Sequence, residues 1–325
     1  MRVHLCCTAA VTRTTNTARL APHVGGGLLL VCLAGVIWGT IGPGVRLVHE
    51  WSGLSPLTIS AYRAIAAVVV LLVLALVTRR LARLWSLAHR QWRRVIIVGL
   101  LTAAFQLLFF IAVVATGVSI ATVVCLGFAP VLLLVISCAQ QRRLPSVGRA
   151  LPVLVALVGL LLVSLVGGAG EVAPHPVLGI LTALGSGAAY ALSADVARPL
   201  SQRVDALTMT TATMSVAAAV LVPGGLLLAY GRREALTTTD TGSWLVIGYL
   251  GVVTMVVAYV LFFTGLRSTS SGAAVVATLL EPVTAVLIAV LFLDERLTPA
   301  GLFGCLLIIA AIASSGRQSD DLQPQ

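Results

Sequence analysis

An uncharged, largely apolar stretch occupies residues 95–115 and reads VIIVGLLTAAFQLLFFIAVVA. A helix of about 20 apolar residues crosses the hydrocarbon core of a bilayer, which is roughly 30 Å thick. Similar stretches recur through all 325 residues, so that 59% of the chain is hydrophobic and only 10% is charged. Soluble domains carry roughly 25% charged residues. The sequence therefore predicts an integral membrane protein and excludes a soluble enzyme, a disordered chain and a disulfide scaffold.

The apolar stretches predict helices, since they are continuous runs and not the short alternating segments of a membrane β-barrel. Spans are expected at residues 26–48, 55–78, 95–115, 118–139, 147–167, 177–197, 206–230, 244–266, 272–293 and 299–316. The seventh span is the least apolar, because threonine occupies several positions between 208 and 213.

The longest connection between the expected spans, residues 79–94, is rich in arginine. Trp85 and Trp92 lie seven residues apart within it, which would put both on one face of a helix lying in the headgroup region. Most other arginines fall on the same side of the membrane, and positive loops mark the cytoplasmic side. Both termini are therefore expected in the cytoplasm. The net charge of +10 then reflects membrane orientation rather than nucleic-acid binding.

The second half of the chain matches the first at an offset near 152 residues. Trp38 falls on Tyr190, and Pro130 falls on Pro282. Each repeat holds five expected spans, and an odd number inverts the second copy relative to the first. The fold class expected is therefore an all-α membrane protein whose ten transmembrane helices form two inverted five-helix repeats. Secondary transporters recurrently use such repeats. A duplication retained only for fold stability is the alternative.

The expected domain organisation follows from these spans. It comprises a cytoplasmic N-terminal tail (1–25), a first repeat (26–167), an extracytoplasmic linker (168–176), a second repeat (177–316) and a cytoplasmic C-terminal tail (317–325).

Charges inside a membrane are costly and mark functional candidates, and Glu281 is the clearest of them. It lies within the ninth span, directly before Pro282. Proline removes a backbone donor and loosens the helix, so helix breaks are expected at Pro282 and at its counterpart Pro130. A carboxyl group beside such a break could take up a proton or hold a cationic group of a substrate. The alternative is a carboxylate satisfied by a neighbouring helix. The first repeat has Ala129 at the equivalent position.

Arg63 lies within the second span. It could bind a substrate carboxylate, reach the lipid headgroups or pair structurally with an acid; the structural role is favoured. Trp38 and Tyr190 are expected to face each other through the repeat symmetry and to line a central cavity, with a packing role for either as the alternative. Tyr259 is a further hydrogen-bonding candidate, although polar contacts between helices would explain it equally well. For Asp195 and Arg198, less than one turn apart near the end of the sixth span, a local ion pair is expected.

No residue pattern indicates a cofactor, a metal site or a catalytic nucleophile. The histidines and cysteines show no metal-ligand spacing, and no phosphate-binding glycine loop is present. The chain is therefore not expected to be an enzyme. The expected partners are the lipid bilayer, a small-molecule substrate and protons as candidate coupling ions, with a homodimer left open.

Residues 26–316 resemble the EamA-domain transporters of the drug/metabolite transporter superfamily. The matching motifs are Gly35-Val36-Ile37-Trp38-Gly39-Thr40, Ser55-Pro56, Tyr62-Arg63, Pro130, Tyr259, Phe263, Gly265-Leu266-Arg267, Ala273-Ala274, Leu280-Glu281-Pro282 and Leu291-Phe292-Leu293-Asp294-Glu295-Arg296-Leu297-Thr298. The resemblance implies a ten-helix, inverted-repeat carrier of small metabolites with its cavity between two five-helix bundles. The family commonly ends its fourth and ninth spans with Gly-Glu; here the fourth has Arg142-Arg143 and the ninth Asp294-Glu295.

The function predicted from the sequence is secondary active transport. A small metabolite, amino acid-like or amphipathic, would leave the cell across the cytoplasmic membrane by alternating access. A gradient-driven facilitator or uniporter of the same fold is the alternative. A membrane-embedded sensor or enzyme is a remote one, because the chain offers neither a reactive constellation nor a sizeable loop domain.

Overall fold

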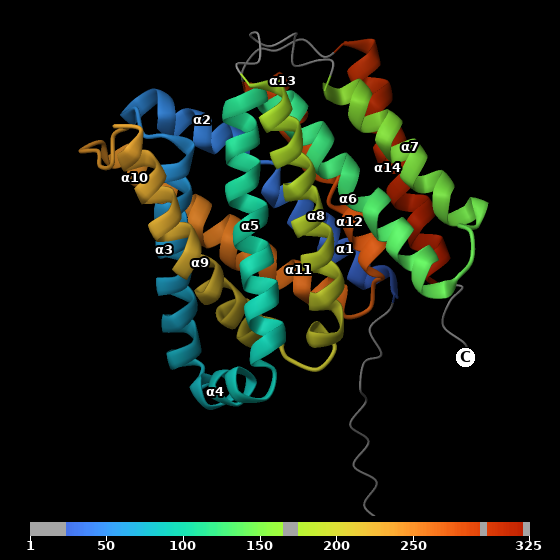
Figure 1. Ribbon diagram of the computed structural model, residues 1–325, viewed down its shortest axis with the longest axis horizontal. Helices are drawn as coiled ribbons and strands as arrows, with labels where there is room; N and C mark the ends of the chain where they lie inside the picture. Colours follow the sequence, from blue (N-terminus) through green and yellow to red (C-terminus); the bar gives the residue numbers. More distant parts are fainter. Residues whose placement is uncertain (1–23, 165–174, 293–297, 321–325) are drawn as a thin grey trace, which may run out of the picture.

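The computed structural model describes residues 24–164, 175–292 and 298–320, and within these ranges the chain is helical with no strand (Figure 1). Nine helices of the described residues are long and apolar enough to cross a membrane, and the apolar helix Pro299–Ser315 is shorter. The protein is therefore a multi-pass membrane protein.

The helices follow the expected spans, with several interruptions. The first part of the chain forms α1 (Val24–Trp38), α2 (Ile41–Ser52), α3 (Pro56–Val77), α4 (Leu81–Arg90), α5 (Trp92–Thr116), α6 (Val118–Gln141) and α7 (Val147–Ser164). The second part forms α8 (Pro176–Ser201), α9 (Ala206–Gly231), α10 (Thr241–Tyr249), the π-helical segment η2 (Leu250–Val257), α11 (Ala258–Leu266), α12 (Ser271–Ala277), α13 (Leu280–Phe292) and α14 (Pro299–Asp320).

Helix α4 corrects one expectation about the arginine-rich connection. It ends at Arg90, with Gln91 as its C-cap, and Trp92 opens α5. Trp85 and Trp92 thus belong to two helices and not to one face of a single helix. Trp85 is nevertheless well exposed, and Leu87 is the buried residue of α4. In Figure 1 this short helix lies across the lower end of the molecule, which we call the arginine-rich end.

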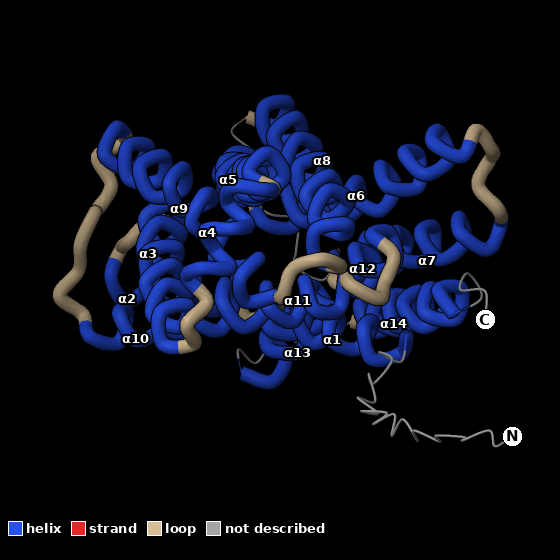
Figure 2. The backbone as a smooth tube through the Cα atoms, turned by 90° about the horizontal axis from the view of Figure 1, so that it is seen from below, coloured by secondary structure: helices blue, strands red, loops and turns tan. Residues whose placement is uncertain are grey.

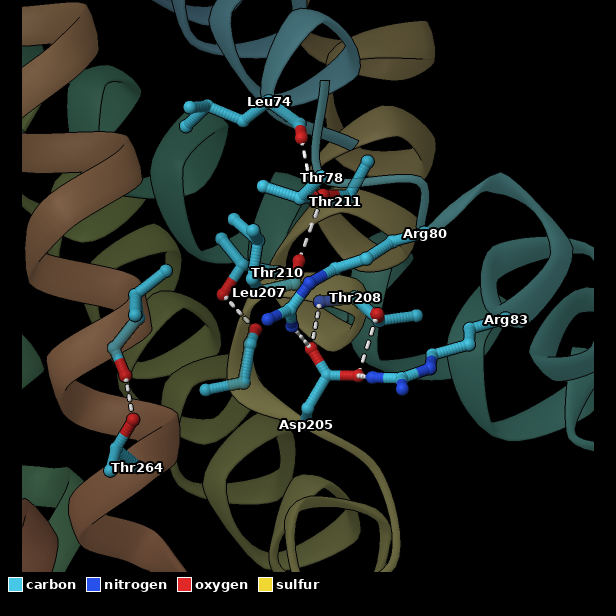
Figure 3. Close-up of polar contacts among 12 residues, drawn as sticks. Leu74, Thr78, Arg80, Arg83, Asp205, Leu207, Thr208, Thr210, Thr211 and Thr264 are labelled. Carbon is cyan, nitrogen blue, oxygen red and sulfur yellow. Dashed lines mark hydrogen bonds and ion pairs between the residues drawn. The ribbon is translucent and has the colours of Figure 1, made fainter. Parts of the chain in front are cut away.

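The threonines of α9 do not weaken that span. Thr210, Thr211 and Thr213 are fully buried, and each donates its hydroxyl hydrogen to a carbonyl oxygen one turn earlier, at 2.8–2.9 Å. Figure 3 shows the first two of these bonds beside Asp205, the N-cap of α9, which also accepts from Arg80. Because these hydroxyls have partners within the helix, they can lie against α3 and α5 at little cost.

The helices pack in matching pairs from the two halves of the chain. Helix α5 packs against α8 as α11 packs against α1, and α6 packs against α8 as α12 and α13 pack against α1. Helices α3 and α9 form one further pair, and α7 and α14 another, the latter side by side at one edge of the molecule (Figures 1 and 2).

Glycines make the closest of these contacts and repeat at the offset of 152 residues. A Cβ on Gly27 of α1 would overlap Ser268, and a Cβ on Gly179 of α8 would overlap Thr116. Residues 27 and 179, like 116 and 268, are 152 positions apart, so one contact is built twice. Small residues let helix backbones approach closely in a membrane. The sequence repeat is therefore also a repeat of helix packing.

Candidate functional site

A cavity of about 400 Å³ lies between α6, α7, α8, α12 and α14. Its polar lining comprises Ser137, Gln140, Gln141, Arg149, Asp195, Arg198, Ser270, Ser271 and Ser315. Its apolar lining includes Pro130, Leu133, Leu134, Pro152, Val153 and Val276. Gln140, Gln141 and Ser270 are exposed, so the cavity reaches the surface at the arginine-rich end. Pockets for small molecules have volumes of this order.

Asp195 and Arg198 do not form the expected ion pair. Asp195 Oδ1 accepts a hydrogen bond from the Ser271 hydroxyl at 3.2 Å, and Arg198 Nε donates to the Thr269 carbonyl at 2.8 Å. The acids that form ion pairs in the described part of the chain are Glu50 and Asp205. The physical reason for the difference is tertiary: Thr269 in the α11–α12 connection binds Arg198, and Ser271 at the start of α12 binds Asp195.

A second hydrogen bond joins α8 to the α12–α13 break, at residues that do not line the cavity. Tyr190 and Thr278 lie with their hydroxyl oxygens 2.7 Å apart, and the Thr278 hydroxyl also contacts the Val275 carbonyl at 2.8 Å. Since a threonine hydroxyl has one hydrogen, which Thr278 gives to that carbonyl, Tyr190 is the donor of the pair. Phe105 packs on the Tyr190 ring with centroids 5.0 Å apart. Phe105 and Tyr190 line a second, smaller pocket together with Tyr259 and Phe262 of α11.

Trp38 and Tyr190 are both buried, and neither lines the 400 Å³ cavity. Trp38 packs instead against Tyr259 and Phe262 of α11, with ring centroids at 5.1 and 5.5 Å. Its Nε1 donates to the Thr254 carbonyl at 2.9 Å. That carbonyl lies in η2, where the Ala258 N–H bonds to Val253, five residues earlier. A π-helical turn shifts the backbone bonding in this way and leaves carbonyls open to side chains.

Arg63 lies buried in α3 with few partners. Its Nη2 donates to Gln106 Oε1 of α5 at 3.0 Å, whereas Arg63 Nε, Arg63 Nη1 and Gln106 Nε2 have no acceptor among the described residues. Arg63 interacts electrostatically with Glu281 and Tyr259 but forms no ion pair with Glu281 in the part of the chain that the structure describes. Burying a charged group whose hydrogen-bond donors lack acceptors costs free energy. A purely structural role therefore does not explain why an arginine occupies this position.

Glu281 lies where two interrupted helices cross. The chain leaves helical conformation at Gly39–Thr40, between α1 and α2, and again at Thr278–Leu279, between α12 and α13. A Cβ on Gly39 would lie 2.6 Å from the Glu281 carbonyl oxygen, so α1 touches the first turn of α13 directly. Discontinuous helices that meet near mid-membrane form substrate and ion sites in transporters.

The helix break expected at Pro130 is not observed, because α6 runs through this residue from Val118 to Gln141. A proline removes a single backbone hydrogen bond, and neighbouring helices make prolines tolerable in membrane helices. Here Gly187 of α8 packs on the Cys125 carbonyl, and Gly127 packs on Leu157 of α7. Pro130 itself lines the cavity. Pro282, by contrast, follows four residues after the break at Thr278.

The sequence did not indicate the polar lining of the cavity. Arg149, Gln141 and Ser271 lie at helix ends, where polar residues were attributed to loops. Their convergence depends on how five helices pack, and no local pattern shows it. Asp294, Glu295 and Arg296 fall outside the described residues.

The fold and this cavity define the class: an all-helical, multi-pass membrane protein with a solute-sized pocket reaching one end. The chain belongs to the EamA-like transporter family, whose sequence pattern matches residues 25–165 and again residues 177–316. It thus holds two EamA domains and is a member of the drug/metabolite transporter superfamily.

Relatives and solved structures agree with this assignment. The chain is 29% identical over 285 residues to "Uncharacterized transporter YwfM" of Bacillus subtilis (strain 168), covering 87% of this chain and 91% of the relative. It is 28% identical over 209 residues to "Uncharacterized transporter" of Archaeoglobus fulgidus, covering 64% and 70%. A solved structure described as "Crystal structure of protein" shares the fold at a TM-score of 0.73 and 17% identity, covering 92% of this chain and 99% of that one. The protein is therefore a membrane transporter.

Proposed function

We propose that the protein is a secondary active transporter that exports a small metabolite across the cytoplasmic membrane by alternating access. The observation that carries this proposal is the cavity, which lies between helices of both halves of the chain and reaches the surface at the arginine-rich end. A solute-sized cavity that opens at one end is what alternating access requires of one of its states.

The proposed architecture supports this mechanism. It has ten spans in two inverted five-helix repeats, residues 26–167 and 177–316, joined by an extracytoplasmic linker at 168–176. The tails 1–25 and 317–325 then lie in the cytoplasm, because positive charge accumulates at the arginine-rich end. The matching helix pairs and the glycine contacts repeated 152 residues apart support a two-fold relation between the halves. The state described here is then open to the cytoplasm.

Glu281 is the proposed coupling residue. It is an acid near mid-membrane, at the crossing of two interrupted helices and within the electrostatic reach of Arg63. Taking up a proton removes its charge, which changes its attraction to Arg63. Such a change favours one packing of the helix crossing over the other. Protons are therefore the proposed coupling ion.

A facilitator of the same fold is the second candidate, and Arg63 favours it. A permanent positive charge near Glu281 can hold that carboxylate in its charged form as a structural partner, and no proton would then be moved.

Flux into inverted membrane vesicles separates the two candidates. Radiolabelled amino acids and amphipathic amines are offered with and without an inside-acidic pH gradient, using wild type and Glu281→Gln. Exposed Glu50, which pairs with Arg46, gives the matched control Glu50→Gln. We expect gradient-driven accumulation in wild type and in the control, and only equilibration in Glu281→Gln. Equilibration in all three would select the facilitator, and no flux of any compound would contradict the transport proposal.

A further inference from the structure

We propose that the cavity selects a zwitterionic solute, one that carries a cationic amine and a carboxylate beside an apolar substituent, with Asp195 holding the amine and Arg198 the carboxylate. This inference rests on the proposed transport function and names the class of its substrate.

Asp195 supplies a carboxylate without a counter-ion. One of its oxygens accepts from Ser271, and no ion pair with Asp195 occurs within the described residues. It is the one acid among the side chains that line the cavity. A hydroxyl donor does not neutralise a half-buried carboxylate, so a cationic group placed there gains a charge-assisted hydrogen bond.

Arg198 supplies an oriented guanidinium group. Its Nε is fixed on the Thr269 carbonyl, while its two terminal nitrogens make no hydrogen bond to the described residues. A guanidinium whose inner nitrogen is tied down presents its outer nitrogens as a fork, the geometry that binds a carboxylate through two parallel bonds. The other cavity arginine, Arg149, already donates to Gln141.

The spacing of the two charges fits one small head group. Asp195 and Arg198 lie three residues apart on α8, and side chains at this spacing have Cβ atoms about 5–6 Å apart. Since Asp195 and Arg198 form no ion pair with each other, a head group with an amine and a carboxylate attached to one carbon can lie between them. The apolar part of the cavity lining includes Leu133, Val153 and Val276. A substituent of the solute would pack there.

Binding to the purified full-length protein in lipid nanodiscs tests the inference. The probes share one phenyl substituent and differ in charge: L-phenylalanine, phenethylamine, 3-phenylpropionate and N-acetyl-phenylalaninamide. Calorimetric titration of wild type should give L-phenylalanine a Kd at least about tenfold lower than either singly charged probe. Asp195→Asn should remove the advantage of the amine, so that 3-phenylpropionate binds as well as L-phenylalanine. Arg198→Gln should do the converse for phenethylamine.

Controls keep the result interpretable. Exposed Arg203 near the end of α8 gives the control Arg203→Gln, which should bind as wild type does. Asp195→Glu and Arg198→Lys keep the charges and should retain part of the preference if the first variants fold poorly. Equal binding of a singly charged probe to wild type, unchanged preferences in both variants, or binding of none of the probes would overturn the inference. Vesicle flux of another solute in those cases would leave the transport proposal standing, whereas absence of any flux would contradict it separately.

Discussion

Two helix crossings related by the repeat differ in structure: one has a continuous helix, and the other has an interrupted helix that carries an acid. At the first, α8 crosses α6, and Gly187 packs on the Cys125 carbonyl. At the second, α1 crosses α12 and α13, and Gly35, 152 residues before Gly187, packs on Thr278. A proline occupies the equivalent position in both, yet α6 is continuous and the α12–α13 segment is interrupted.

The difference teaches that proline alone does not set the break. The first crossing has Leu126 and Ala129 where the second has Thr278 and Glu281. At the second crossing the Thr278 side chain bonds Tyr190 and the Val275 carbonyl, and the Glu281 backbone N–H bonds the Thr278 carbonyl at 2.9 Å. One copy of the repeat therefore keeps the regular helix, while the other holds an acid at an interruption.

Introducing an acid at the first crossing should have the largest effect on the stability of the protein. Ala129 is fully buried in the continuous helix α6, so Ala129→Glu would place a carboxyl group where the structure has no opening for it. We expect a loss of several kcal/mol in stability, in the range of about 3–5 kcal/mol seen for uncompensated buried charges. Thermal unfolding in detergent measures it, with Ala129→Ser as the control. A melting temperature equal to that of the wild type would show that the crossings are interchangeable.

Filling the glycine contacts should have an intermediate effect and distinguish the crossings. Gly39→Ala and Gly187→Ala both force a Cβ against a backbone carbonyl, at a cost of about 1–3 kcal/mol each. Gly42→Ala is the control, since no atom lies within 4 Å of its Cβ position. Of the two substituted glycines, Gly39 is the one that contacts the interrupted α12–α13 segment. If both variants lose the same stability, vesicle flux should therefore fall further in Gly39→Ala than in Gly187→Ala. Equal flux in these two variants would remove the functional distinction.

The smallest effect on stability should come from the ion pairs of Asp205 with Arg80 and Arg83, which lie outside both crossings. Burial raises the pKa of Asp205, but hydrogen bonds from Thr208 and the charge of Arg80 outweigh it, so that the pKa lies below its ordinary value. The carboxylate therefore stabilises the fold above the unfolded-state pKa of about 4, and this contribution disappears as the pH falls through the lower folded-state pKa. About a third of the side chain is exposed, which limits the gain to roughly 1 kcal/mol.

Asp205→Asn tests this contribution, because asparagine caps a helix nearly as well and only the charge is lost. Melting temperatures of wild type and variant should converge below about pH 4 and separate slightly above it, with vesicle flux at neutral pH unchanged. A difference that persists unchanged at low pH would show that the cap, and not the charge, matters.

The sequence was informative about spans and much less so about interruptions. Hydropathy and length locate helices because the bilayer imposes both. The break at Gly39–Thr40 lies inside one apolar stretch, and it depends on a contact with Glu281 and Thr284 far along the chain. Glu281 and Arg63 stood out because charges are rare in spans, and they lie within electrostatic reach of each other. Their functional roles stay predictions.

Predictions from local residue spacing were wrong where a segment distant in sequence supplies the hydrogen-bond partners. Asp195 and Arg198 are spaced for an ion pair, but Ser271 of α12 binds Asp195 and Thr269 of the α11–α12 connection binds Arg198. The repeat was a better guide for Trp38 and Tyr190: each packs on an aromatic ring of the equivalent helix, α11 for Trp38 and α5 for Tyr190.

Two side-chain hydrogen bonds tie α8 to the α12 segment: Asp195 to Ser271 near the surface, and Tyr190 to Thr278 deeper in. On the proposed binding mode, an amine that occupies Asp195 competes with the Ser271 hydroxyl for the same carboxylate. Binding of the solute would then replace the outer hydrogen bond and leave the Tyr190–Thr278 bond in place. Recognition of the solute and loosening of the contact between α8 and α12 would thus occur at the same carboxylate.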